Sequence, residues 1–385
     1  MVKNLQRTFI WVLTLVSILP ISIQVSQAQG CVAVRSFSGC ATAGSGSGAI
    51  LMPGESMITS NFRYFQSFRH FRGAEQEYYR VENGTQVIND SYFLDLSFTY
   101  AFANRFFATA TLPFVYHERS SMYEHGGNPP NGLGERHHTY AQGLADMRLS
   151  AGYWLLDPVK NTKRNLALSL GMKLPTGKYD AKGKFYNQGP DRNETRLLAV
   201  DQSIQPGDGG FGATIELQGY QVLSDVLLLN GNFFYLLNPR ETNGALTRNG
   251  NTEFSVPDQF AALLAVTYLT PLNGLAASIG GRIEGIPAYD LIGGSDGFRR
   301  PGYVISAEPG LSYSFGNLLV NASVPISLIR NRTKSYLDRE FEKANNQPRH
   351  GDAAFADYLI NVGVAWRFGG KKQHKMEMHD IETPL

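Results

Sequence analysis

Hydrophobic and polar positions alternate along most of the chain with the two-residue period of a β-strand. The segment from Tyr358 to Phe368 is the most regular: its even positions are aromatic or branched apolar residues, and its odd positions are mainly small or polar. The segment 92–102 repeats this pattern and carries an aromatic residue at each end of its apolar face. Apolar residues at helical spacing with capping signals do not recur over any long segment between residues 57 and 368. The chain is therefore predicted to be all-β.

The alternation predicts about twelve strands, and the lengths of the links between them indicate the class of β-fold that they form. The predicted strands lie near residues 56–68, 88–102, 106–118, 143–156, 165–178, 209–222, 225–238, 256–270, 274–287, 301–315, 317–330 and 354–368. Every second link is a tight turn, and the links between those turns are longer, mostly polar loops.

A soluble β-sandwich has no reason to separate short links from long ones. A β-barrel of the outer membrane does, because its periplasmic turns are short and its surface loops are long. The even strand number and strands longer than the roughly 9–11 residues that cross a bilayer agree with this class. We predict an antiparallel transmembrane β-barrel over residues 56–368, closed because an open edge would leave backbone groups unpaired in lipid.

The first residues have the pattern of a cleavable secretory signal. Lys3 and Arg7 precede an apolar run over 9–25, and a small residue, Ala28, marks the expected cleavage site. A membrane-anchoring helix is disfavoured, because Pro20 and the polar residues that follow it leave too short an apolar span. The prediction is a signal peptide over 1–28 and localisation in the cell outer membrane.

Two further segments flank the predicted barrel. Residues 29–55 form a predicted periplasmic N-terminal segment that holds both cysteines, Cys31 and Cys40. In the oxidising periplasm these two thiols are expected to form a small disulfide loop. Acylation of Cys31 as in a lipoprotein is the alternative, but the leucine expected three residues upstream is missing. Residues 369–385 break the alternation and are predicted to be a periplasmic tail.

Charge and motif content exclude several classes of function. Without residues 1–28 the chain has 33 basic and 33 acidic residues, since the 35 basic and 33 acidic residues of the whole lose only Lys3 and Arg7. This balance argues against binding to nucleic acid. The adjacent His137 and His138 lack a supporting carboxylate or thiolate, so we expect no metal site and no cofactor.

An enzymatic role has little support in the sequence. The Gly-x-Ser-x-Gly string at Gly293–Gly297 lies in a predicted loop without the strand-to-helix elbow of a hydrolase. A lipid hydrolase on the barrel rim would need a serine and a histidine within hydrogen-bond reach. We expect that the protein is not an enzyme and has no catalytic residue.

Assigning faces by parity places ten charged residues inside the barrel, where lipid does not reach them. Five are cationic and five anionic: Arg63, Asp95, Asp146, Arg148, Lys173, Glu216, Arg282, Glu284, Glu308 and Arg367. They are the candidate lumen-lining residues. Two interpretations remain open: a polar conduit with a selectivity zone, and a mutually neutralising set of ion pairs that fills a narrow lumen.

Five prolines stand toward the outer ends of upward strands. They are Pro113, Pro175, Pro239, Pro287 and Pro325, and each removes a backbone donor from the ladder near the outer rim. They could simply terminate strands. The functional hypothesis is that they open gaps through which an apolar solute leaves sideways into the membrane.

Three strings in the middle of the chain resemble a known family of outer-membrane proteins. They are GLADMRLSAGY at 143–153, GMKLPTGKYD at 171–180 and QPGDGGFGATIELQGYQVL at 205–223. In this order they look like the phenol meta-pathway degradation (MetA-like) transporter family, with Ala145 in place of its usual glycine. The resemblance implies a monomeric barrel that passes small aromatic or apolar compounds, and it transfers no substrate-binding residue.

Together these features predict an outer-membrane channel or transporter for small aromatic or hydrophobic molecules. The alternatives are a structural or adhesive barrel with a plugged lumen and, with less support, a rim lipid hydrolase. The expected partners are outer-membrane lipid, the small-molecule cargo and the barrel-assembly machinery, which reads an aromatic-terminated last strand such as the one ending at Phe368. A monomer is expected.

Overall fold

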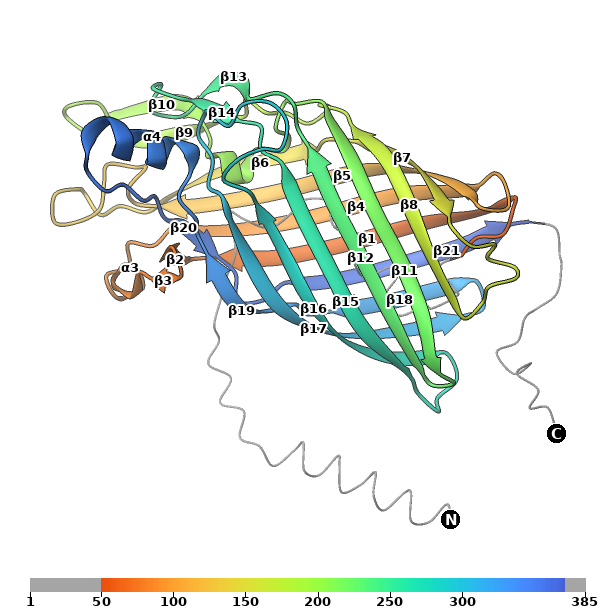
Figure 1. Ribbon diagram of the computed structural model, residues 1–385. Helices are drawn as coiled ribbons and strands as arrows, with labels where there is room; N and C mark the ends of the chain where they lie inside the picture. The colour runs from red at the N-terminus through yellow and green to blue at the C-terminus, as the bar shows by residue number, and fades with distance from the viewer. Residues whose placement is uncertain (1–49, 371–385) are drawn as a thin grey trace, which may run out of the picture.

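The computed structural model describes residues 50–370, which form a closed antiparallel barrel (Figure 1). Its main sheet has 14 strands. Two of the barrel's strands are each interrupted and counted as two: β6 and β7 both pair with β5, and β18 and β19 both pair with β17. The barrel wall therefore has twelve strand positions. The strands are β1 (Glu55–Ser67), β4 (Ile88–Ala101), β5 (Phe106–Ser121), β6 (His137–Leu144), β7 (Arg148–Trp154), β8 (Arg164–Lys173), β11 (Gly212–Ser224), β12 (Leu227–Leu237), β15 (Gln259–Leu269), β16 (Leu275–Ile286), β17 (Gly302–Phe315), β18 (Leu318–Ser323), β19 (Ile326–Asn331) and β21 (Ile360–Gly369).

The barrel closes between its first and last strands. β1 pairs with β21 from Glu55 opposite Gly369 to Tyr64 opposite Ile360, and β1 also pairs with β4 along its length. All ladders of the sheet are antiparallel, so successive strands run up and down. The predicted fold class is confirmed.

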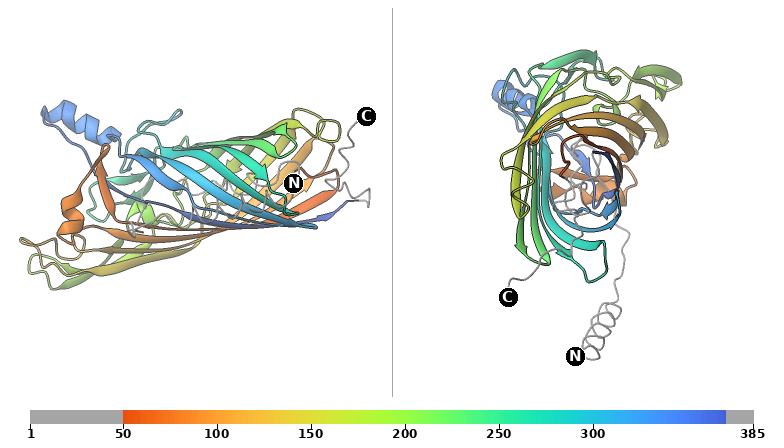
Figure 2. Two further views of the ribbon diagram at one scale, coloured as in Figure 1. Left: turned by 90° about the horizontal axis from the view of Figure 1, so that it is seen from below. Right: turned by 90° about the vertical axis from the view of Figure 1, so that its right-hand side faces the viewer.

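Short and long connections lie at opposite ends of the barrel (Figures 1 and 2). The short end has tight links such as Gly316–Asn317, where Gly316 adopts a positive φ of 57°. The long loops carry small elements: β2 (Arg69–Arg72), β3 (Glu75–Gln76), α3 (Tyr78–Glu82), β9 (Lys182–Gln188), β10 (Glu194–Ala199), η2 (Gln202–Ile204), β13 (Thr242–Leu246), β14 (Glu253–Ser255), α4 (Tyr336–Asn345) and β20 (Ala353–Phe355). By the usual orientation of such barrels, the long loops form the outer end.

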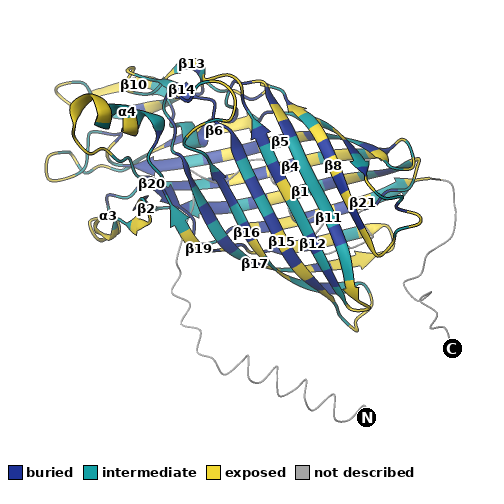
Figure 3. Cartoon of the chain, in the orientation of Figure 1, coloured by how far each residue is buried: buried dark blue, intermediate teal, exposed yellow. Residues whose placement is uncertain are grey.

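Buried residues alternate with less buried ones along the strands, as Figure 3 shows by colour. The less buried face is the apolar outer face. On β4, Leu94, Leu96 and Phe98 point outward and are 38–45% exposed, whereas Asp95 between them is 6% exposed. Apolar side chains are stable on the outside because lipid surrounds them, and a charge there costs about 2–4 kcal/mol at mid-depth. The buried inner face therefore carries the polar and charged residues.

Aromatic side chains mark both edges of this apolar band. Near the outer rim the rings of Tyr64, Tyr92, Tyr116 and Tyr140 follow one another across β1, β4, β5 and β6, with centroid distances of 4.8, 5.8 and 6.5 Å. At the short-turn end the Phe106 ring lies 4.7 Å from that of Tyr153. Such girdles stand at the two interfaces of a membrane barrel.

Some strand boundaries differ from the predicted ones. The strand predicted over 143–156 begins earlier, at His137, and is interrupted at 145–147. The last barrel strand begins at Ile360 rather than at 354, because Ala353–Phe355 pairs with β2 in a separate small sheet. Both differences arise from pairing between distant segments, which local alternation does not reveal.

The loops also contain helices that the alternation did not predict. The helix α4 has a capping box, in which Ser335 and Asp338 bond to each other's backbone amides. That Ser-x-x-Asp spacing was the local signal for it. Among the helices of the described chain, none is long and apolar enough to cross a membrane.

Several predictions fall outside the described residues. The signal peptide over 1–28, the disulfide between Cys31 and Cys40, and the tail from residue 371 onward belong to this group. Of the predicted N-terminal segment, residues 50–55 are described. Ile50 and Leu51 are buried among side chains of the short-turn end that include Phe107 and Trp154.

Candidate functional site

The barrel interior holds a fully buried cluster of charges on β16 and β17. The Arg282 guanidinium lies 2.8 Å from the Glu284 carboxylate and 3.5 Å from that of Glu308. These three residues are 1–4% exposed, and the Ser323 hydroxyl donates to Glu308 at 2.7 Å. Removing the Arg282 guanidinium would leave two buried carboxylates without the cation they share, so the cluster depends on this residue.

Three other charged residues that parity placed inside the barrel lie on the inner face of β1, β4 and β21. Arg63 on β1 donates through Nε to Asn361 on β21 at 3.3 Å. Asp95 is buried on β4, opposite Asn61 of β1 in the register. Arg367 faces inward on β21 opposite Met57, and it is half-buried.

Two more of the predicted residues fasten the long loop 174–211 to the rim. Asp146 accepts hydrogen bonds from the amides of Gly177 at 2.9 Å and Asp208 at 3.0 Å, and Lys173 forms an ion pair with Asp208. The chain passes so closely here that a Cβ on Gly177 would lie 2.8 Å from the Cα of Gly207. Part of the glycine-rich string at 205–223 thus serves this close approach.

The remaining pair lines a cavity near the short-turn end, which we call the inner cavity. Arg148 on β7 lies 3.8 Å from Glu216 on β11, and the guanidinium also stands over the Phe234 ring at 5.6 Å. The cavity measures about 160 Å³, and hydroxyl groups such as those of Thr99 and Thr214 line much of it. Of the ten candidate residues, Arg148 and Glu216 are the two that line this cavity.

Two further cavities lie toward the outer end of the barrel and share one residue, Arg300. The middle cavity, of about 60 Å³, is lined by Phe65, Phe93, Phe254 and several amide and hydroxyl side chains. The outer cavity, of about 340 Å³, lies under the surface loops. It is lined by His70, Arg80, Val87, Arg119, Tyr123, Asn128, Arg300, Asp352, Ala353 and Ala354.

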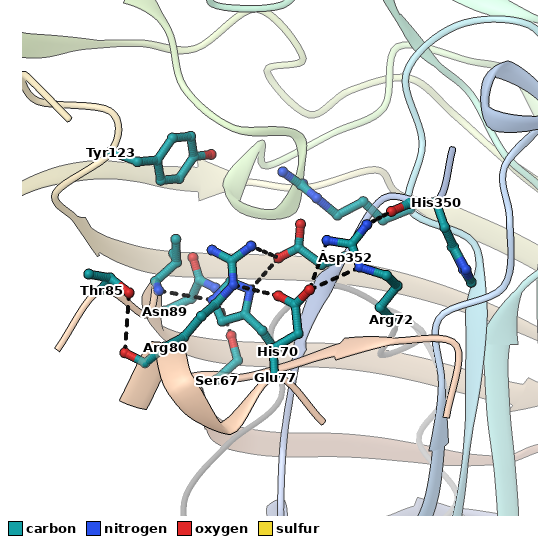
Figure 4. A network of polar contacts seen from close by, with 12 residues as sticks. Ser67, His70, Arg72, Glu77, Arg80, Thr85, Asn89, Tyr123, His350 and Asp352 are labelled. Carbon is teal, nitrogen blue, oxygen red and sulfur yellow. Dashed lines mark hydrogen bonds and ion pairs between the residues drawn. The ribbon is translucent and has the colours of Figure 1, made fainter. Parts of the chain in front are cut away.

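A network of polar contacts borders the outer cavity and joins two distant loops (Figure 4). His70 Nε2 accepts a hydrogen bond from the Val87 amide at 3.0 Å, and its Nδ1 lies 2.5 Å from Asp352. Arg80 bridges Asp352, at 3.0 Å, and Glu77, at 2.5 Å. Because Nε2 is an acceptor, Nδ1 carries the proton and donates to Asp352. Sequence reasoning missed this site, since no local pattern links residue 70 to residue 352.

The electrostatics of this network follow from burial and from its ion pairs. Burial lowers the pKa of His70, although the hydrogen bond and charge of Asp352 act in the opposite direction. Burial alone would raise the pKa of Asp352, but the hydrogen bond from His70 and the charges of His70, Arg80 and Arg300 outweigh it and hold that pKa well below its usual range. At neutral pH the histidine is neutral and the aspartate is ionised.

The same residues do not suit a metal ion. His70, Glu77 and Asp352 offer ligand atoms within 4.8 Å of one another. However, both ring nitrogens of His70 are occupied by hydrogen bonds, and the carboxylates already pair with Arg80 and, in the case of Glu77, with Arg72. A cation there would have to displace two guanidinium groups, so the geometry is that of an ion-pair network.

The five prolines occupy three kinds of position. Pro113 lies within β5, which continues beyond it to Ser121. Pro175, Pro239 and Pro287 follow the ends of β8, β12 and β16, as expected of residues that terminate strands. Pro325 separates β18 from β19.

Strand pairing is interrupted near two of these prolines. Beyond Pro175, β6 pairs with β5 but not with β8. A groove of about 710 Å³ is lined there by Tyr116, Tyr140, Lys182 and Leu197, among others. Beyond Pro325, β19 does not form a ladder with β21. It contacts the segment just before β21 through one isolated bridge, between Ile326 and Tyr358.

The serine of the Gly-x-Ser-x-Gly string has a structural contact. Its hydroxyl, on Ser295, accepts a hydrogen bond from the Asp290 amide at 3.0 Å. Asp290 in turn pairs with the buried Arg299 at 2.6 Å. These bonds hold the loop in place, and none of them resembles a nucleophile activated by a base.

The fold and the lined interior define a transmembrane β-barrel of the outer-membrane type, and solved structures share this fold. The COG4313 outer membrane channel from Pseudomonas putida F1 is 12% identical, with 83% of this chain and 97% of that chain covered and a TM-score of 0.53. The CymD monoaromatic hydrocarbon channel is 10% identical, with 88% and 96% covered and a TM-score of 0.41. The similarity to the COG4313 channel, at 12% identity, concerns the fold alone. No family model and no curated protein matches the chain.

Proposed function

We propose that the protein is an outer-membrane channel or transporter for small aromatic or hydrophobic molecules. The observation that carries this proposal is the succession of outer, middle and inner cavities along the barrel interior. A structural barrel would gain stability from filling this space, because packed interiors lose contacts at voids. Retained space along the barrel axis is the expected feature of a protein that admits a solute.

The lining favours a solute with an apolar part. Phe65, Phe93 and Phe254 contribute aromatic surface to the middle cavity. Binding sites for small molecules combine such surface with a few placed polar groups. The resemblance to the MetA-like family in the strings at 143–153 and 171–180 agrees with this solute class, and we include kinship with that family in the proposal.

Sideways release into the membrane is part of the proposal. The groove at Tyr116, Tyr140 and Leu197 lies where β6 loses its neighbour after Pro175, so the wall has no continuous ladder there. An apolar solute that reached this point would meet these side chains and also the charged ones of Lys178, Asp180 and Lys182. We also propose outer-membrane localisation, a monomer, and assembly through the barrel-assembly machinery.

A structural or adhesive barrel with a plugged lumen is the second candidate. The buried cluster of Arg282, Glu284 and Glu308 favours it, because these ion-paired side chains are buried in the interior and leave little of their surface open to a solute. The two candidates differ in whether this cluster can give way to a solute.

Single-channel recording on the refolded mature chain in a planar bilayer separates them. The channel is expected to conduct steadily and to be blocked by small aromatic solutes such as toluene or benzyl alcohol. A folded, heat-modifiable barrel that stays silent and fails to speed the entry of these solutes into vesicles would overturn the proposed function and support the plugged barrel.

A further inference from the structure

Guanidinium groups outnumber carboxylates among the side chains that line the outer cavity. Of the described residues that line it, Arg80, Arg119 and Arg300 bring guanidinium groups, whereas Asp352 brings the carboxylate. Asp352 already pairs with Arg80 and accepts from His70. The surface that faces the cavity is therefore cationic.

The guanidinium groups are held in fixed positions by acids behind them. Arg300 makes a two-point contact with Asp201 at 2.7 and 2.6 Å, and Arg119 pairs with Glu124 at 3.0 Å. Asp201 and Glu124 are not among the residues that line the cavity. Such clamping fixes the guanidinium planes before a ligand arrives, which lowers the entropic cost of binding it.

The rest of the cavity suits a small organic molecule. Val87, Ala353 and Ala354 give it an apolar wall, and Tyr123 adds a hydroxyl group. Its volume of about 340 Å³ falls within the size range of small-molecule sites. Guanidinium groups match carboxylates in shape and charge better than any other side chain does.

The middle cavity indicates how a ligand would be oriented in the interior. It shares Arg300 with the outer cavity, and beyond that residue it presents the rings of Phe65, Phe93 and Phe254. A molecule with its anionic group at Arg80 and Arg300 could place an aromatic body against these rings. Cationic and aromatic surfaces thus follow one another along the interior.

We infer that the outer cavity is a binding site for the carboxylate of small aromatic acids, with Arg80, Arg119 and Arg300 as its anion-recognising residues. The inference rests on the proposed function, because it specifies the solutes that this interior admits. Within the aromatic solutes it selects anions of the benzoate class.

The test is equilibrium binding of benzoate to the refolded full-length barrel in non-ionic detergent, followed by calorimetry, with benzamide as the uncharged analogue of the same shape. Benzoate should bind saturably and at least about tenfold more tightly than benzamide, since hydrogen bonds to charged groups are the stronger ones. Binding should weaken as salt rises. Equal binding of the two compounds would overturn the inference.

Variants locate the site. Arg80→Gln should weaken benzoate binding about tenfold. The matched control is Arg72→Gln, because Arg72 also pairs with Glu77 but is 45% exposed and does not line the cavity. Arg300→Gln gives a second measurement if Arg80→Gln disturbs the loop, and heat-modifiability on gels verifies folding. Equal losses in Arg72→Gln and Arg80→Gln, or no loss in either lining variant, would contradict the inference.

Flux separates this inference from the proposed function. If benzoate binds but the barrel passes no solute, the result supports the binding site and contradicts the proposed channel function. A channel that passes toluene but neither binds nor admits benzoate would keep the proposed function and overturn the inference.

Discussion

Asp352 accepts a hydrogen bond from the Nδ1 of His70 at 2.5 Å, although 282 positions separate the two residues. This bond joins the first long loop of the barrel to the last one, beside the strands that close it. The Arg80 guanidinium strengthens the junction by pairing with the same carboxylate at 3.0 Å. The outer end is thereby closed into a ring of loops in the same way as the barrel beneath it.

This junction should lose stability in mild acid. Burial lowers the pKa of His70 in the folded loops, so the unfolded loop binds more protons than the folded one between that lowered pKa and the usual value of 6.5. Stability therefore rises with pH through this window and falls as pH drops below 6.5. The protection factors of the amides over residues 69–87, taken relative to the intrinsic exchange rate at each pH, should fall in that range. In His70→Gln this pH dependence should disappear, and an unchanged profile would contradict the assignment.

A second pH effect is expected where the loop at 122–136 meets the β9–β10 hairpin. Burial lowers the pKa of His125 to about 4, and its Nδ1 accepts a hydrogen bond from the Tyr186 amide at 3.1 Å. A protonated ring cannot accept that bond. The protection of the Tyr186 amide should therefore be lost as pH falls from 6.5 through about 4. The control is His137, whose ring centroid lies 5.3 Å from that of His125. His137→Gln should leave the hydrogen bond between the Tyr186 amide and His125 in place.

Breaking the buried charge cluster should destabilise the barrel strongly. Arg282→Gln removes the guanidinium that lies 2.8 Å from Glu284 and 3.5 Å from Glu308, and leaves two buried carboxylates without the cation they share. The expected loss is about 3–5 kcal/mol in the free energy of unfolding. Denaturant unfolding in lipid vesicles measures it. Glu194→Gln is the control, since Glu194 belongs to an exposed pair with Arg196, and its expected effect is below about 1 kcal/mol.

Ion selectivity should depend on the pair that lines the inner cavity. Glu216→Gln leaves the charge of Arg148 uncompensated and should shift the reversal potential toward anion selectivity. Arg148→Gln should shift it the other way. The two variants serve as controls for each other, since they remove opposite charges from one site. Shifts in the same direction, or none in a conducting channel, would show that ions do not pass this cavity.

The orientation of the outer face can be tested with a charge placed in lipid. Leu264 points outward from the middle of β15 and is 59% exposed, so Leu264→Arg should cost about 2–4 kcal/mol of folding free energy in vesicles. Leu291 is 70% exposed in a surface loop, where water surrounds it, and Leu291→Arg should cost close to nothing. Similar costs for both substitutions would place the membrane boundary elsewhere.

The barrel itself could be predicted from the sequence because its rules are local. Lipid outside and a crowded polar interior impose a two-residue period on every strand, so residues such as Leu94 and Asp95 reveal their faces without any knowledge of partners. The lengths of the links distinguished the periplasmic end of the barrel from the outer end, because they too can be read from the sequence without knowing which residues meet in space. Parity likewise selected Arg282 and Glu284 as interior residues, although it could not show that they pair with each other.

The outer cavity was decided by tertiary structure alone. His70 and Arg80 come from the first long loop, and Arg300 and Asp352 come from two later ones. Surface loops have no periodicity to constrain them and carry polar residues whether or not they form a site. Their meeting depends on which loops the closed barrel brings together at one rim, and on ion pairs whose partners lie hundreds of residues apart. The sequence by itself determined the wall and the polarity of its two faces. Closure of the wall determined which charges meet above it, because only a closed ring brings the first and last loops side by side.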